Sequence, residues 1–347
     1  MHFASAAHTT KPPLHCPTCS SRKIIRKGVR RKKLETVQLW RCTICKRVFT
    51  PAPGALRNKT YPLPVILRGM ELYNLGYPLS QVVTKLKSRF GYSISNSTIN
   101  NWIHEHEELM SYHRLRKEAI RAFRPTTTIK SVKLYHRQVY EFAYHQPKLL
   151  FTRSSMQHGK FAGLADFIES VPTICPHELF GESARASQLD AGFINPSRLI
   201  VTPKENFATR TAEFVLPTIG NNYLRHGTLQ RFMLVNDSVT VAVEIPIWLK
   251  PSDIAEIEAE YSTRLLAQGA EGASITGHID FIQVRHDKVH ILDYKPDAKT
   301  NRPVAQLTIY ALAISRLAGI PLFDIKCAWF NEEQYCEFFP GALLPRR

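Results

Sequence analysis

The sequence lacks several features that would assign it to other protein classes. No apolar run in its 347 residues is long enough to span a lipid bilayer, so no membrane association is expected. The N-terminus has no hydrophobic signal core, so secretion is not indicated. Apolar residues make up 44% of the chain and aromatic residues 10%, which excludes general disorder. The length is typical of two or three domains.

Acidic residues are scarce in the first third of the chain. Residues 1–125 contain 23 Lys and Arg against 6 Asp and Glu, a net charge of +17, whereas residues 126–347 contain 23 of each sign. All of the excess positive charge therefore lies in the N-terminal third. This asymmetry predicts a basic module that contacts a polyanion, with DNA as the expected partner, joined to a neutral module with another task.

Four of the seven cysteines form two CxxC pairs. Cys16 and Cys19 form the first pair, and Cys42 and Cys45 form the second. The pairs argue for metal binding in a reducing compartment, and we expect a cytoplasmic protein, nucleoid-associated if the source is prokaryotic. Four thiolates at this spacing predict a structural zinc site. The alternating segment between the pairs predicts a β-hairpin that needs the metal in order to fold.

The three remaining cysteines, Cys175, Cys327 and Cys336, do not complete a second set of four. They are one ligand short of a four-cysteine iron–sulfur cluster. We expect them to be buried thiols.

The cysteine segment resembles the zinc ribbons at the N-termini of transposases, including the aromatic Phe49 shortly after the last cysteine. Its basic side chains are expected to contact phosphates, although a solvated surface role remains open for each of them. These residues are Arg26, Lys27, Arg30, Arg31, Lys32 and Lys33.

Residues 51–64 contain four prolines and one glycine, which is typical of a linker. A helical apolar period follows. A second helix is predicted with Ser80 as its N-cap and Gly91 as its stop, and a third with Ser95 or Asn96 as its N-cap.

The third predicted helix places Ile99, Trp102 and Ile103 on one apolar face. The arrangement is similar to the helix-turn-helix of insertion-sequence transposases, although an ordinary helical bundle remains possible. In the DNA-binding interpretation, four polar residues of this helix face a groove of the duplex. They are Asn96, Ser97, Asn100 and Asn101.

Two apolar runs near the C-terminus predict a β-hairpin, with a turn at Arg285, His286 and Asp287. Each run contains one carboxylate, Asp280 or Asp293, and Lys295 follows. Because side chains alternate along a strand, Asp293 and Lys295 point to the same face, and pairing brings Asp280 close to it. Two partly desolvated carboxylates predict a hard cation between them, Mg²⁺ or Mn²⁺.

This hairpin and the helix after it resemble the PD-(D/E)XK nucleases of the RecB-like branch. The matching residues are Gly277-x-x-Asp280, Asp293-Tyr294-Lys295 and Gln306-x-x-x-Tyr310. The resemblance covers the last third to half of the chain. A buried salt-bridged cluster is the alternative explanation for these charged residues.

The resemblance also implies a role for each residue. The two aspartates hold the metal with the main-chain carbonyl of Tyr294, and Lys295 activates or positions the attacking water. Gln306 and Tyr310 steady the lysine and the DNA end of the site. A histidine on an upstream helix is a further metal ligand, for which His226 is the candidate.

Glu244 lies inside another apolar strand. An accessory acidic role at the site and a hydrogen-bonded structural role remain equally open for it.

The predicted fold is a mixed α/β sheet flanked by helices, like that of restriction endonucleases, preceded by two small modules. The boundaries are 1–60 for a zinc ribbon, 61–125 for a helix-turn-helix, 126–150 for a connector of uncertain assignment, and 151–347 for the nuclease domain. Within 126–150 the alternation suggests a strand pair.

The sequence therefore predicts a metal-dependent DNA nuclease that is directed to DNA by its N-terminal modules. One alternative is a transcriptional regulator with an inert nuclease domain, and another is a transposase-associated protein of a mobile element. A transposase with a DDE active site is disfavoured, because the carboxylates lie on one hairpin instead of in a widely spaced Asp–Asp–Glu pattern.

Overall fold

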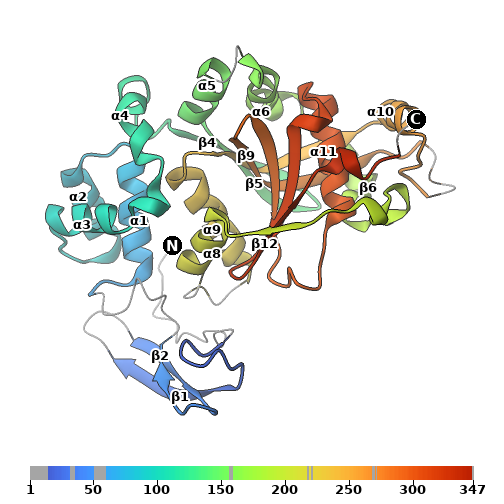
Figure 1. Ribbon diagram of the computed structural model, residues 1–347. Coiled ribbons are helices and arrows are strands. Elements are labelled where there is room, and N and C mark those ends of the chain that lie inside the picture. Colours follow the sequence, from blue (N-terminus) through green and yellow to red (C-terminus); the bar gives the residue numbers. More distant parts are fainter. Residues whose placement is uncertain are drawn as a thin grey trace.

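A computed structural model describes the residues 15–31, 36–50, 60–155, 159–216, 219, 222–267, 270 and 272–345. They form a small three-stranded sheet near the N-terminus and a nine-stranded mixed sheet flanked by helices (Figure 1). The mixed α/β fold class predicted from the sequence is confirmed. Among the described residues, no helix combines the length and the apolar character needed to cross a bilayer.

The small sheet is antiparallel and contains β1 (Ile24–Arg31), β2 (Thr36–Cys42) and β3 (Val48–Phe49). Most of its side chains are exposed, but Trp40 is buried and pairs with Phe49 across the strands. The predicted hairpin is therefore present, and its own apolar core is small.

Three helices follow: α1 (Leu63–Asn74), α2 (Leu79–Phe90) and α3 (Asn96–Glu105). Gly91 ends α2 with a left-handed φ of 75°, as predicted. Ser95 caps α3 by accepting a hydrogen bond from the Thr98 N–H at 3.1 Å. The predicted cap at Ser80 is wrong, because α2 already begins at Leu79, directly after Pro78.

The large sheet has the strand order β4-β5-β8-β9-β10-β11-β12-β7, and β6 pairs with β9. Its pairs are antiparallel except β10–β11 and β6–β9. The strands are β4 (Ile129–His136), β5 (Gln138–His145), β6 (Ala184–Arg185), β7 (Thr202–Lys204), β8 (Thr240–Leu249), β9 (Ile275–Arg285), β10 (Lys288–Tyr294), β11 (Ile325–Phe330) and β12 (Tyr335–Phe338).

The segment 126–150 supplies β4 and β5, so it is part of the large sheet. The two strands form the suggested pair, and β5 hydrogen-bonds to β8 through Ala143 and Tyr144. The last residues of the segment, 146–150, belong to the helix α5 (Gln146–Ser155).

Helices cover both faces of the large sheet (Figure 1). One hydrophobic core joins the sheet to α6 and α11, and the other joins it to α1–α3, α8 and α9. The helices α1–α3 therefore share a core with the segment that contains the predicted nuclease motif. The remaining helices are α4 (His113–Ala122), α5 (Gln146–Ser155), α6 (Ala162–Ile174), α7 (Leu179–Glu182), α8 (Phe207–Val215), α9 (Asn222–Asn236), α10 (Pro251–Tyr261) and α11 (Val304–Ala318).

The hairpin β9–β10 lies in the middle of the sheet. His286 and Asp287 form its turn, with φ of 49° and 53°. Two central residues in the left-handed region match the twist of the flanking strands in a two-residue hairpin. Arg285, which was predicted in the turn, is the last residue of β9.

Candidate functional site

The two aspartates of the β9–β10 hairpin lie next to each other. The register pairs Leu292 with Phe281, which places Asp293 beside Asp280. Both residues are buried, with exposed fractions of 2% and 9%. The Tyr294 N–H donates to Asp280 Oδ2 at 2.9 Å. The strand pairing thus brings two carboxylates into a desolvated position, as the sequence predicted.

Lys295 follows the end of β10 and pairs with Asp293. Its Nζ lies 2.9 Å from Asp293 Oδ2. Burial raises the pKa of Asp293 to about 7, with Asp280 adding to the rise and Lys295 opposing it. Burial acts to lower the pKa of Lys295, yet the Asp293 carboxylate outweighs it, so that pKa is raised. The ammonium is therefore held in its charged form.

His226 reaches this pair from α9. Its Nε2 lies 3.5 Å from Asp280 Oδ2 and 3.2 Å from the Tyr294 carbonyl oxygen. Burial opposes its charged form, but Asp280 and the Tyr294 carbonyl outweigh burial and raise its pKa. The histidine, the aspartate and the main-chain carbonyl predicted as ligands therefore converge on one position.

Glu244 joins the same group from β8. Its backbone has a left-handed φ of 52°, which a glutamate in a strand rarely adopts. A carboxylate oxygen of Glu244, an oxygen of Asp280 and a ring nitrogen of His226 lie within 4.8 Å of one another. Burial and the charge of Asp280 raise the pKa of Glu244 to about 7. Of the two roles left open by the sequence, this position favours the accessory acidic role.

Gln306 and Tyr310 lie one turn apart on α11, and Gln306 Nε2 is 2.8 Å from the Tyr310 hydroxyl. Tyr310 packs against Gly277 on β9, where a Cβ atom would approach the Tyr310 ring to 2.6 Å. The glycine of the motif is therefore required for the close approach of helix and strand. The predicted action of Gln306 on Lys295 stays a prediction, since the contact seen here is with Tyr310.

The donor atoms present fit a hard divalent cation. They comprise carboxylate oxygens, one carbonyl oxygen and one imidazole nitrogen. Oxygen-rich sets of this kind suit Mg²⁺ or Mn²⁺.

The segment that holds these groups was compared with known protein families. Residues 224–334 match the PD-(D/E)XK nuclease superfamily. That range contains His226, the hairpin carboxylates, Lys295 and the Gln306–Tyr310 pair. The search of curated proteins found no match for the chain. The similarity is thus limited to about a third of the chain, and the residues before 224 and after 334 lie outside the match.

Sequence reasoning missed Gln230 in the matched segment. It lies one helical turn after His226 on α9, and its Nε2 donates to Glu244 Oε1 at 2.7 Å. The amide holds the Glu244 carboxylate toward His226 and Asp280. The i, i+4 spacing from the candidate histidine was the available signal.

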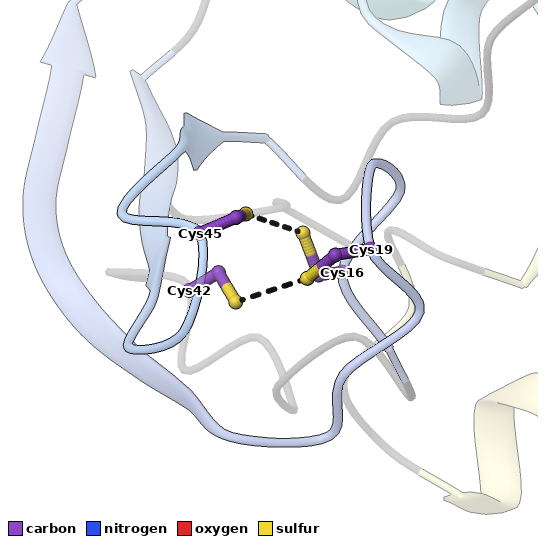
Figure 2. Close-up of side chains that lie close together, drawn as sticks. All are labelled: Cys16, Cys19, Cys42 and Cys45. Carbon is purple, nitrogen blue, oxygen red and sulfur yellow. Dashed lines mark hydrogen bonds between the residues drawn. The ribbon is translucent and has the colours of Figure 1, made fainter.

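The four N-terminal cysteines converge on one point (Figure 2). Cys16 Sγ lies 3.5 Å from Cys45 Sγ, and Cys19 Sγ lies 3.6 Å from Cys42 Sγ. A tetrahedron of sulfurs around zinc, each at 2.3 Å from the metal, has edges of about 3.8 Å. The two CxxC pairs thus come together as predicted and could hold one metal ion, and zinc as that ion stays a prediction.

The residues predicted to contact DNA are exposed where the structure describes them. Arg30 and Arg31 lie on β1, and Arg26 lies over the Trp40 ring at 5.8 Å. Lys32 and Lys33 lie outside the described residues. The exposed polar residues of α3 are Asn96, Ser97, Asn100 and Asn101.

Proposed function

We propose that this protein is a Mg²⁺- or Mn²⁺-dependent deoxyribonuclease that hydrolyses phosphodiester bonds. The observation that carries the proposal is the convergence of Asp280, Asp293, Lys295 and His226 within the segment that matches the nuclease superfamily. A buried structural ion pair would not require the third carboxylate that Glu244 adds to this group.

The chain supplies two kinds of group for this chemistry. The divalent ion would be held by His226, Asp280, Asp293, Glu244 and the Tyr294 carbonyl. The bound ion supplies an activated water and neutralises charge on the reacting phosphate. Lys295 adds a fixed positive charge beside the same position, where it can orient the water and stabilise negative charge on the phosphate oxygens.

We further propose that the N-terminal modules direct the nuclease domain to DNA. The support is the net charge of +17 confined to residues 1–125, together with the exposure of Arg30, Arg31 and the polar face of α3. The arginines would contact phosphates, and asparagines of α3 can read adenine in the major groove.

A cleavage assay on plasmid and single-stranded DNA tests the enzymatic proposal. We expect cutting that requires Mg²⁺ or Mn²⁺ and stops when a chelator is added. A pure protein that binds DNA but cuts neither substrate with either metal would instead be a DNA-binding regulator with an inert nuclease domain.

A further inference from the structure

A second group of potential metal ligands lies apart from the carboxylates and the ribbon. It consists of His136 at the end of β4, Cys175 directly after α6, and His177. Their ligand atoms lie within 4.8 Å of one another. We propose that these three side chains form a second zinc site, independent of the nuclease activity.

The distances within this group are close to those of a zinc site. His136 Nε2 lies 2.8 Å from His177 Nδ1 and 3.9 Å from Cys175 Sγ. Tetrahedral bonds to zinc would place two nitrogens about 3.3 Å apart, and a nitrogen and a sulfur about 3.6 Å apart. Shifts of about half an ångström in the side chains are therefore enough to admit the ion.

The donor types select the metal. One thiolate and two imidazoles suit zinc, whereas Mg²⁺ and Mn²⁺ prefer the oxygen-rich set around Asp280. Binding replaces the proton of the Cys175 thiol, which is released to solvent. His136 and Cys175 are buried and His177 is exposed, so the fourth coordination position faces water.

The surrounding residues hold His136 in place. Arg137 forms the one-residue turn between β4 and β5 with a left-handed φ of 59°. Its guanidinium donates to the carbonyls of Gly181, at 2.7 and 3.0 Å, and Ser183, at 3.0 Å. Phe180 stacks on the His136 ring with a centroid separation of 3.7 Å. These contacts hold the tip of the β4–β5 hairpin against the segment that carries Cys175 and His177.

A further histidine sets the orientation of the buried ligand. His136 Nδ1 lies 2.9 Å from His278 Nε2, and the His278 ring stacks on Tyr140 at 3.5 Å. When the Nδ1–H of His136 donates a hydrogen bond to His278 Nε2, the Nε2 of His136 carries a lone pair that faces Cys175 and His177. Ligating histidines commonly use their second nitrogen in this way. Through His278 the site also contacts β9, the strand that carries Asp280.

The rival explanation is an ion-free chain of hydrogen bonds, His177–His136–His278. That chain satisfies the same nitrogens but gives Cys175 no ligand role. The two explanations differ in the number of zinc ions that the full-length protein retains.

Elemental analysis of the full-length protein, dialysed against a weak chelator with excess Mg²⁺, decides between them. We expect two zinc ions per chain, one in the ribbon and one here. His177→Ala should lose one ion and remain folded, because His177 is exposed. Cys175→Ser should lose the same ion. Cys336→Ser is the matched control at another buried cysteine and should keep both.

His226→Ala is the control for zinc captured by the nuclease site, and it should also keep both ions. A single zinc ion in the wild-type protein would overturn the proposal. So would two ions that survive His177→Ala, or a second ion that is lost from His226→Ala and kept in His177→Ala.

Discussion

Asp293 and Glu337 are both buried in the large sheet, but their surroundings shift the pKa values of their carboxyl groups in opposite directions. Burial and the neighbouring Asp280 raise the pKa of Asp293 to about 7. Burial also acts on Glu337, but its ion pairs with Lys204 and Lys326 outweigh it and lower its pKa. Glu337 is therefore a stabilising ion-pair partner, whereas the charge of Asp293 stays unfavourable in the metal-free protein even with Lys295 beside it.

The two residues should give the metal-free protein opposite pH dependences. Asp293 in the folded protein stays protonated up to about pH 7, whereas in the unfolded chain it ionises near pH 4. The folded state thus binds more protons in this window, and the Asp293 contribution to stability falls as the pH rises through it. The ion pairs of Glu337 stabilise the protein fully at pH values above the pKa that Glu337 has in the unfolded chain. This contribution is lost as the pH falls through the lower pKa of Glu337 in the folded protein.

Thermal unfolding in chelator from pH 2.5 to 8 measures both effects, because Asp293 acts between about pH 4 and 7 and Glu337 acts below about pH 4.5. Asp293→Asn should gain stability relative to wild type as the pH rises, and Glu337→Gln should lose it. Excess Mg²⁺ should reduce the difference between Asp293→Asn and wild type, because the ion stabilises only the carboxylate. The same pH slope for both variants would contradict this account of the site.

At the scale of elements, α1 supports the helix that carries His226. Asn74 on α1 donates through Nδ2 to Asn236 Oδ1 on α9 at 2.9 Å, with both side chains buried. Glu71 Oε1 accepts from Arg231 Nε at 2.6 Å on the same interface. The position of α9 over the sheet thus depends on a helix outside the matched nuclease segment.

Removal of the Asn74 amide should therefore destabilise the protein. Asn74→Ala leaves the buried Asn236 oxygen without that donor, which costs about 1–3 kcal/mol. Asn100→Ala on the exposed face of α3 is the control and should change stability by less than about 0.5 kcal/mol. Equal denaturation midpoints for the two variants would show that the buried amide pair contributes no stability.

Local patterns were sufficient to predict the central hairpin and the three N-terminal helices. Strand alternation placed Asp293 and Lys295 on one face, and Gly91 and Ser95 marked helix ends through backbone conformation and capping. Ser80 was misassigned as a cap, because a serine inside the first turn has the same local sequence signal as one that precedes it. These features depend on residues a few positions apart.

Features that depend on distant contacts could not be predicted. The pairing of β5 with β8 joins segments about 100 residues apart, so the place of residues 126–150 in the sheet was open. The role of Glu244 depends on its left-handed φ and on its hydrogen bond with Gln230. The alternation of residues along the strand predicts neither of them. His136 reaches Cys175 and His177 only through the fold, because 38 residues separate it from Cys175 in the sequence.

For the whole molecule, the uneven charge should determine how DNA is bound. The full-length chain should bind duplex DNA with an affinity that falls steeply with salt, because each phosphate contact releases counterions. Arg30→Ala with Arg31→Ala should reduce the slope of log affinity against log salt by about two. Fluorescence anisotropy at several salt concentrations measures the slope.

The control for this experiment is Arg316→Ala, in the neutral part of the chain. Arg316 is paired with Glu256 and Glu260 on α10, so its removal should leave the slope unchanged. A salt dependence that is flat, or equally affected by both changes, would place the DNA contacts elsewhere.

The metal-dependent cleavage of DNA by matched variants tests the central claim most directly. We expect wild-type protein to cut plasmid or single-stranded DNA with Mg²⁺ or Mn²⁺. Asp293→Ala and Lys295→Ala should each lose on the order of 100-fold or more in rate and still bind DNA. Asp287→Asn in the exposed turn of the same hairpin should cut like wild type, since asparagine tolerates its left-handed φ of 53°. Cleavage that persists in Asp293→Ala and Lys295→Ala, or is absent from the wild-type protein with both metals, would contradict the account.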